Sequence, residues 1–207
     1  MASVRGVLID IDGVLTVSWR PLPGAVEALR TVREAGLCVA LVTNTTSRTR
    51  ASIADTLVAA GFPVTAEDIL TAPAATAVHL AGARCALLNS GDVREDLAGV
   101  TLVAADDDTV VPDVVLLGGA GPEFGYTALN RAFGQLQRGA RLVAMHRNLY
   151  WRTEAGLQLD AGAFLAGLEA AAGVGRGKTA AAGTRAGSPL ATGPGYGEAA
   201  ACSRAPL

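Results

Sequence analysis

The chain has 207 residues, of which 50% are hydrophobic, 17% are charged and only 4% are aromatic. This length and this hydrophobic fraction exclude a disordered chain and suit an α/β protein whose core is built from Ala, Val and Leu. The formal net charge of -2 provides no broad basic surface, so we expect neither a nucleic-acid partner nor an anionic membrane partner.

The cysteines and the N-terminal segment bear on the cellular compartment. Cys38, Cys85 and Cys202 are widely spaced and odd in number, which fits neither a disulfide framework nor a paired zinc site. The first strand-like segment begins without the apolar stretch of a signal peptide or of a membrane span. We therefore expect reduced cysteines and a cytoplasmic protein.

The first part of the chain alternates strand and helix patterns. Val4–Asp10 and Leu37–Val42 are short apolar runs, which are typical of buried parallel strands. A helical pattern from Pro23 to Gly36 follows the first run, and another at Arg48–Ala60 follows the second. Thr65–Asp68 has the spacing of a capping box. The order of these elements predicts a parallel sheet with right-handed crossovers.

A second set of patterns follows, and then an irregular tail. We expect strands at Cys85–Leu88, Val100–Ala104, Val114–Leu117 and Arg141–Met145, and helices at Tyr126–Gln137 and Ala161–Ala172. The patterns alone allow either a continuation of the first sheet or a separate insert. From Val174 onward the chain is dominated by Ala, Gly, Thr, Ser and Pro, and its apolar residues follow neither the helical nor the strand period. We therefore expect it to lie outside any packed sheet.

Two carboxylates mark the end of the first predicted strand. In an open parallel sheet, ligands bind beyond the carboxyl ends of the strands, where Asp10 and Asp12 lie. Gly13 allows the chain to turn sharply there. The pair suits a nucleophile and a general acid/base, and a divalent cation, Mg²⁺, would be needed to bring a phosphate dianion to them. The alternative is a pair of solvated turn residues.

The second predicted strand ends in groups that can hold a phosphate. Thr43 offers a hydroxyl group and Asn44 an amide, and backbone N–H groups follow where the next helix begins. The alternative for residues 43–46 is a simple helix N-cap.

These two motifs resemble those of the haloacid dehalogenase superfamily of phosphatases. Asp10–Leu15 is similar to motif I of that family, and Val42–Thr45 is similar to motif II. The resemblance implies that Asp10 forms an aspartyl-phosphate and that Asp12 protonates the leaving group and then activates water. It also implies that Thr43, Asn44 and Thr45 bind the substrate's phosphoryl group, and that Mg²⁺ is held by Asp10 and by the backbone carbonyl of Asp12.

The middle of the chain resembles subfamily IIA of this superfamily. Glu67–Pro73 is similar to a stretch of that subfamily, whose members carry a large α/β cap inserted after motif II. Tyr150–Gly162 most resembles the branch that contains phospholysine phosphohistidine inorganic pyrophosphate phosphatase. The resemblance implies a Rossmann-like core in residues 1–82, a cap in residues 83–173 and an irregular tail in residues 174–207.

The tail departs from the family pattern. In the family, a Gly-Lys-Pro motif and an acidic Gly-Asp-Asp motif follow the cap and complete the active site. Here Lys178 is a displaced candidate for the catalytic lysine, no acidic motif follows, and Glu198 is the only acidic residue after Val174. We hypothesise that the tail results from a frameshift or a truncated gene model, which would leave the core incomplete in its C-terminal half.

Taken together, these motifs indicate a phosphatase with a small phosphorylated substrate, which is a phosphomonoester, a phosphoamino acid or pyrophosphate. His146 follows a predicted cap strand and is either a substrate-binding residue or a structural one. Caps of this subfamily often dimerise, so the resemblance also allows a homodimer through the cap.

Two alternatives to an active phosphatase remain. One is a catalytically inactive remnant that dimerises or binds through its cap. The other is a nucleotide-binding loop at Ala172–Thr179, although this segment lacks the strand that should precede a P-loop.

Overall fold

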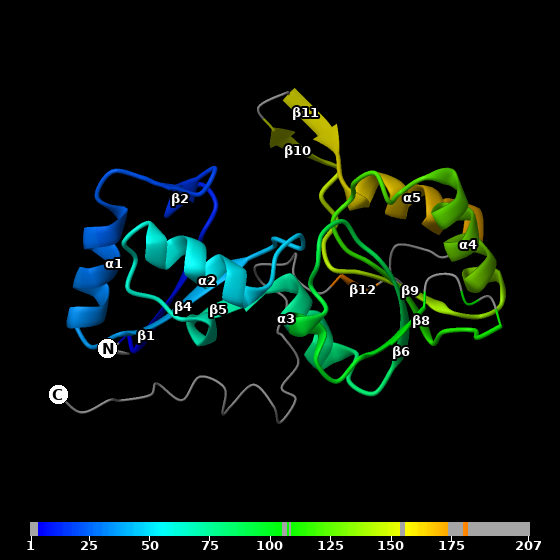
Figure 1. Cartoon of the computed structure of the whole chain (residues 1–207), viewed down its shortest axis with the longest axis horizontal. Coiled ribbons are helices and arrows are strands. Elements are labelled where there is room, and N and C mark those ends of the chain that lie inside the picture. The colour runs from blue at the N-terminus through cyan, green and yellow to red at the C-terminus, as the bar shows by residue number, and fades with distance from the viewer. Residues whose placement is uncertain (1–3, 105–106, 108, 154–155, 174–179, 182–207) are drawn as a thin grey trace.

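The computed structural model describes residues 4–104, 107, 109–153, 156–173 and 180–181, which form two lobes side by side (Figure 1). Each lobe has its own parallel sheet, so the second set of predicted elements does not continue the first sheet. The predicted α/β fold class is therefore confirmed. Within the described residues, no helix is both long and apolar enough to cross a membrane.

The first lobe is a three-stranded parallel sheet with two helices packed on one face. Its strands are β1 (Gly6–Asp10), β4 (Cys38–Thr43) and β5 (Ile69–Thr71), in the order β1-β4-β5, and its helices are α1 (Ala25–Glu34) and α2 (Arg50–Ala59). Every second residue of each strand faces the helices, and each helix packs an apolar stripe against these residues. The most buried members of this core are Ile11, Leu29, Leu41, Ile53 and Leu57, each at most 1% exposed.

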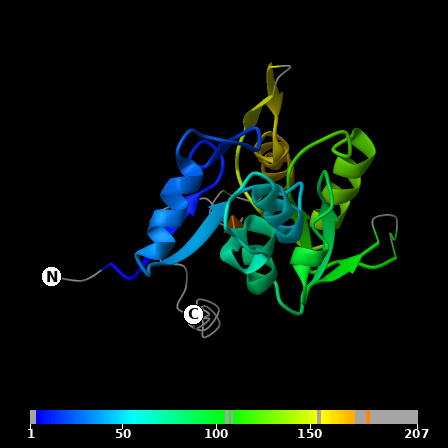
Figure 2. The ribbon, with the colours of Figure 1, turned by 60° about the vertical axis from the view of Figure 1, so that its left-hand side comes forward.

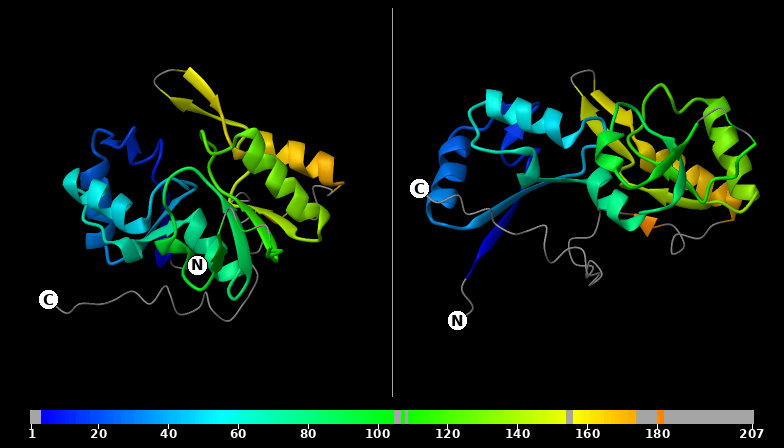
Figure 3. Two further views of the ribbon diagram at one scale, coloured as in Figure 1. Left: turned by 45° about the vertical axis from the view of Figure 1, so that its right-hand side comes forward. Right: turned by 60° about the horizontal axis from the view of Figure 1, so that its bottom comes forward.

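Strand β1 is less buried than the sequence predicts. Ile9 packs against the helices, but Leu8 points to the opposite face of the sheet and is 75% exposed. Figure 3 shows α1 and α2 on the same side of this sheet. The prediction of a buried strand at Val4–Asp10 is wrong in this respect, because among the described residues α1 and α2 cover only one face of this sheet.

The second lobe is a doubly wound sheet. Its strands are β6 (Arg84–Leu88), β7 (Thr101–Val103), β8 (Val114–Leu117), β9 (Arg141–Ala144) and β12 (Ala180–Ala181), in the order β12-β9-β8-β6-β7. All neighbouring strands in it are parallel. The prediction that the tail lies outside any sheet is wrong for Ala180 and Ala181, which pair with Val143 and Ala144.

Helices cover both faces of this second sheet. Helix α3 (Ala72–His79) and the 3₁₀ helix η2 (Glu95–Leu97) pack on one face, and α4 (Tyr126–Gln137) and α5 (Ala161–Ala172) pack on the other. Helix α3 lies before residue 83, where the sequence analysis begins the cap, yet Ala77 and Leu80 belong to this second core. The chain therefore passes from the first lobe to the second at Thr71 and Ala72, where β5 ends and α3 begins.

Two hairpins extend from the lobes. In the first lobe, β2 (Thr16–Val17) pairs with β3 (Arg20–Pro21) directly after Asp12. In the second, β10 (Tyr150–Thr153) pairs with β11 (Gly156–Leu159) and projects away from both sheets (Figure 2). The sequence analysis predicts neither hairpin, because each strand has only two to four residues.

Most predicted elements are present. Helices α4 and α5 and strand β8 have the predicted bounds. The capping box is confirmed at the short 3₁₀ helix η1 (Ala66–Asp68), where the Thr65 N–H donates to the Asp68 carboxylate at 2.8 Å. The same carboxylate binds the Arg33 guanidinium at 2.6 Å, so it ties α1 to this turn.

Cys85 and Cys38 should differ in reactivity. Cys85 is fully buried in β6, and burial, together with the charge of Asp113, raises the pKa of its thiol to about 11, whereas Cys38 is partly exposed. Because the thiolate is the reactive form, iodoacetamide at pH 8 should modify Cys38 at least about tenfold faster in the native protein. Peptide mass spectrometry measures both rates. Equal rates in the native protein would contradict the burial of Cys85, and equal rates in urea serve as the control.

Candidate active site

The parallel register of β1 and β4 brings the two predicted motifs together. Asp10 lies opposite Val42, so Asp10 and Thr43 occupy neighbouring strand ends. The Ile11 N–H donates to the Val42 carbonyl at 3.2 Å and extends this pairing by one residue. Ile11 is fully buried, which leaves Asp10 and Asp12, its two neighbours, on the opposite side of the backbone at the solvent-accessible edge.

A tight turn after Asp12 returns the chain over this edge. Gly13 has φ +83°, a backbone conformation that residues other than glycine rarely adopt. Its N–H donates to the Thr16 carbonyl at 2.7 Å. The amides of Leu15 and Thr16 both donate to the Ile11 carbonyl at 3.0 Å. The backbone around Asp12 is therefore fixed by the fold, and Gly13 has the conformational role that the sequence predicts.

Among the described residues, no cationic side chain forms an ion pair with Asp10 or Asp12. The surroundings raise the pKa of Asp12, first through partial desolvation and then through the negative charge of Asp10, while a hydrogen bond with the Thr45 side chain acts in the opposite direction. These contacts place Asp10, Asp12 and Thr45 in one cluster. A pair of independent, fully solvated turn residues would not interact in this way, so that alternative is disfavoured.

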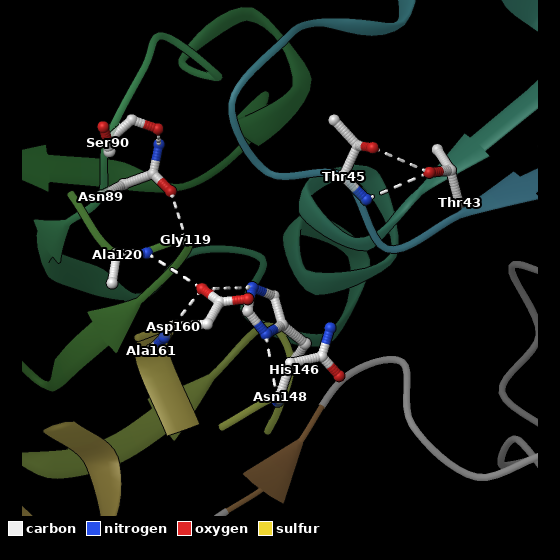
Figure 4. Close-up of polar contacts among 10 residues, drawn as sticks. All are labelled: Thr43, Thr45, Asn89, Ser90, Gly119, Ala120, His146, Asn148, Asp160 and Ala161. Carbon is white, nitrogen blue, oxygen red and sulfur yellow. Dashed lines mark hydrogen bonds and ion pairs between the residues drawn. The ribbon is translucent and has the colours of Figure 1, made fainter. Parts of the chain in front are cut away.

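The end of β4 is organised by side-chain hydroxyl groups. The Thr43 hydroxyl donates to the Thr45 hydroxyl at 3.0 Å and accepts the Thr45 N–H at 3.1 Å (Figure 4). Asn44 lies between them and is exposed. The N-cap of α2 is Thr49, whose hydroxyl accepts the Ser52 N–H, so the alternative that residues 43–46 form a simple helix N-cap is wrong.

In the second lobe, polar residues beyond the strand ends bind the loop that follows β8. Asn89 follows β6 and accepts the Gly119 N–H at 2.9 Å, while Asp160 accepts the Ala120 N–H at 3.2 Å and the Ala161 N–H at 2.8 Å (Figure 4). Asp160 is also the N-cap of α5. The loop that follows β8 is thus held from both sides. The sequence analysis missed these two residues, although an Asp directly before the apolar run of α5 is an N-cap signal.

His146 is buried in this group. It is 2% exposed, its Nε2 lies 3.8 Å from Oδ1 of Asp160, and its Nδ1 accepts the Asn148 N–H at 3.4 Å. Desolvation lowers the pKa of His146, and the Asp160 charge partly opposes this. A neutral imidazole packed against Asp160 fits the structural role, and the substrate-binding role of His146 stays a prediction.

The two lobes touch beside the end of β4. A Cβ atom at Gly119 would lie 2.6 Å from the Thr46 hydroxyl oxygen, and one at Gly91 would overlap the Ser47 backbone. The loop at residues 43–49 is therefore in direct contact with two glycines of the second lobe.

A cavity of about 330 Å³ opens next to this contact and is lined by Ser47, Arg48, Thr49, Ser52, Asp92 and Glu95. The Arg48 guanidinium stacks on the Trp19 ring at 4.9 Å and donates to the Thr56 hydroxyl at 3.1 Å. Neither Asp10 nor Asp12 lines this cavity.

Asp10 and Asp12 are the two carboxylates that the described residues place at the end of β1. The described residues contain no group of three or more His, Cys, Asp or Glu side chains that could hold a metal ion. Lys178, the predicted catalytic lysine, and residues 174–179 of the P-loop alternative lie outside the described residues.

Comparisons with known proteins agree on one family. The model for haloacid dehalogenase-like hydrolases matches residues 7–102. The chain is 34% identical to haloacid dehalogenase-like hydrolase domain-containing protein 2 of Rattus norvegicus over 80% of this chain and 62% of that protein. It is 32% identical to phospholysine phosphohistidine inorganic pyrophosphate phosphatase of Homo sapiens over 84% of this chain and 65% of that protein. The chain thus spans less than two thirds of these relatives.

A solved structure shows the same fold. The glycerol phosphate phosphatase of Mycobacterium tuberculosis, solved in complex with magnesium, superimposes with a TM-score of 0.75 and 30% sequence identity. The match covers 86% of this chain and 54% of that one.

Two glycines of helix α5 should respond oppositely to alanine. A Cβ at Gly162 would overlap the backbone carbonyls of Arg147 and Asn148, which follow β9, whereas a Cβ at Gly167 would meet nothing within 4 Å. We expect Gly162→Ala to destabilise the protein by about 1–3 kcal/mol through overpacking. Gly167→Ala should stabilise it by about 0.5–1 kcal/mol through helix propensity. Urea unfolding measures both. A neutral Gly162→Ala would show that the segment after β9 does not pack on α5 as described.

Proposed function

Because this chain belongs to the haloacid dehalogenase-like hydrolases, and within them resembles subfamily IIA, we propose that it is a Mg²⁺-dependent phosphatase acting on small phosphorylated substrates. The observation that carries the proposal is the cluster of Asp10, Asp12 and Thr45 at adjacent ends of two parallel strands. Two of the similar proteins are phosphatases by name, and one of them was solved with magnesium.

The oxygen donors at the end of β1 fit Mg²⁺. This ion prefers oxygen ligands and keeps several waters, so one or two carboxylates and a backbone carbonyl suffice to hold it beside a phosphate. Asp10 and the carbonyl of Asp12 would be the ligands. The pKa of Asp12 is raised first by partial desolvation and then by the negative charge of Asp10, and a cation bound beside both carboxylates would oppose the second effect. Bound there, Mg²⁺ would neutralise the negative charge that opposes attack of a carboxylate on a phosphate.

The proposed reaction uses two carboxylates in different roles. An Asp10 oxygen attacks phosphorus and the bond to the leaving group breaks, which gives an aspartyl-phosphate on Asp10. Asp12 gives its proton to the leaving oxygen and then takes one from the water that hydrolyses this intermediate. The pKa of Asp12 is shifted upward by partial desolvation and by the Asp10 charge, which is the direction that favours a general acid.

The hydroxyl groups at the end of β4 are proposed to hold the phosphoryl group. Thr43 and Thr45 already form a hydrogen-bonded pair, and the exposed Asn44 amide lies between them in sequence. A phosphoryl oxygen can replace the bond between the two hydroxyls with little rearrangement of the backbone. The substrate class is a phosphomonoester, a phosphoamino acid or pyrophosphate.

A catalytically inactive remnant is the second candidate. Its support comes from the described residues: β1 pairs with β4 alone, Leu8 on the second face of β1 is exposed, and no third carboxylate joins Asp10 and Asp12. In this candidate the second lobe acts as a binding or dimerising module. We also propose a cytoplasmic location and, for either candidate, a homodimer through the cap. Tyr150, Leu157 and Leu159, three apolar side chains of the projecting hairpin, are each at least 60% exposed.

Hydrolysis of p-nitrophenyl phosphate separates the two candidates. We expect turnover that requires Mg²⁺, no measurable turnover with Asp10→Asn because the nucleophile is lost, and a loss of about 10²–10⁴-fold with Asp12→Asn, as for general acid–base groups. Asp113→Asn, a change in an exposed carboxylate of the second lobe, is the control and should retain the rate. Turnover that survives Asp10→Asn, or that needs no Mg²⁺, would refute the mechanism. Absent turnover in the unaltered chain would favour the remnant.

A further inference from the structure

Asp96 is a buried carboxylate of the second lobe that binds groups of the first. It lies in η2, is 4% exposed, and accepts the Arg50 N–H at 2.9 Å and the Arg50 Nε–H at 3.1 Å. It also accepts the Thr71 hydroxyl at 3.1 Å. Arg50 is the first residue of α2, and Thr71 ends β5, so one carboxylate connects η2 with two elements of the first lobe.

The contact with Arg50 completes the N-terminus of α2. The first amides of a helix have no partner within it, and the N-terminus attracts a negative charge. Thr49 takes the amide of Ser52, and Asp96 takes the amide of Arg50. The anion that stabilises the start of this helix thus comes from the other lobe. Asp96 supplies both a hydrogen bond and charge, since it also pairs with the Arg50 guanidinium.

Asp96 is itself held rigidly. Val93 and Leu97, on either side of it, are at most 2% exposed and belong to the apolar core beneath α3. The Thr71 hydroxyl that donates to Asp96 also accepts the Ala74 N–H at the start of α3. The carboxylate therefore cannot follow the 43–49 loop if that loop moves.

The 43–49 loop connects this anchor to the candidate phosphate groups. It begins at Thr43 at the end of β4 and ends at the N-cap Thr49, immediately before Arg50. Between these points Thr46 lies against Gly119 and Ser47 against Gly91. The loop is therefore fixed at one end by β4, at the other by Asp96, and in the middle by two glycines of the second lobe.

We propose that Asp96 is a positioning residue that sets the conformation of the 43–49 loop, and through it the Thr43 and Thr45 groups that hold phosphate. The part of this inference that concerns phosphate rests on the proposed function, whereas the part that concerns the loop does not. Docking of the second lobe thus organises the phosphate-holding groups of the first.

The second lobe offers a matched control. Asp113 also accepts the backbone N–H and a side-chain N–H of one arginine, Arg84, at 2.8 and 3.3 Å, but both residues belong to the second lobe. Asp113→Asn therefore removes the same kind of contact without affecting the first lobe.

Backbone amide exchange, measured residue by residue with NMR, tests the proposal. In Asp96→Asn we expect exchange at least tenfold faster for the amides of Arg50 and Thr45, with the amides of α5 unchanged. Asp113→Asn should leave Arg50 and Thr45 unchanged. Faster exchange of Arg50 alone would overturn the proposal, because Asp96 would then be only a local helix cap. Uniformly faster exchange across both lobes would also overturn it, because the role would then be general stability.

A second variant covers the case in which Asp96→Asn does not fold. Arg50→Met keeps the amide contact and removes only the guanidinium, and we expect the same pattern with a smaller change. An unchanged Thr45 amide in Arg50→Met, with Asp96→Asn unfolded, would count against the proposal.

Inorganic phosphate then tests the link to the site. Its dissociation constant, measured calorimetrically with Mg²⁺ present, should rise at least fivefold in Asp96→Asn and stay unchanged in Asp113→Asn. A loop that loosens without any change in phosphate affinity would remove the phosphate role but leave the loop result standing. If the unaltered chain binds no phosphate, the proposed function fails, and the exchange experiment still decides the role of Asp96.

Discussion

The parallel pairing of β1 with β4 is the constraint on which the candidate site depends. A parallel register makes both strands end at the same edge of the sheet, so two segments more than thirty residues apart deliver their polar groups to one place. Burial of Ile11 and Leu41 against α1 and α2 fixes that register, because a shift of either strand by one residue would turn its own core side chain to the open face. The hydrophobic core thus determines which side of the sheet edge bears the carboxylates.

Placing two carboxylates close together is electrostatically unfavourable, and this indicates what the site can bind. Partial burial raises the pKa of Asp12, and the negative charge of Asp10 raises it further. Structural carboxylates usually have a cationic or hydrogen-bonding partner that offsets this repulsion, as Asp68 has in Arg33 and Asp96 in Arg50. At the end of β1 the described residues offset it through hydrogen bonds alone: Asp10 accepts the Ile11 N–H at 2.8 Å, and Asp12 interacts with the Thr45 side chain. A carboxylate pair with no cationic partner among the described residues, at an accessible edge, is suited to a cation and to the anion that the cation brings.

Much of this could be predicted from the sequence, but not all of it. Helix α4 is predictable because its apolar residues recur with the helical period, and α5 because Asp160 and Gly173 mark its two ends. The cluster of Asp10, Asp12 and Thr43 is predictable because motif spacing fixes position on a strand. The exposure of Leu8 is not, since it depends on what covers the second face of the sheet. The role of Asp96 is not either, because an acidic residue in a short 3₁₀ turn gives no local signal of a partner forty-six positions away.

Paramagnetic relaxation by Mn²⁺, a spectroscopic substitute for Mg²⁺, tests the central claim most directly. If the ends of β1 and β4 form one cation and phosphate site, low concentrations of Mn²⁺ should broaden the amide signals of residues 10–13 and 43–45 first, and inorganic phosphate should strengthen the effect. Broadening that is confined to other acidic residues, such as Asp92 and Glu95, or that leaves residues 43–45 unaffected, would contradict the account.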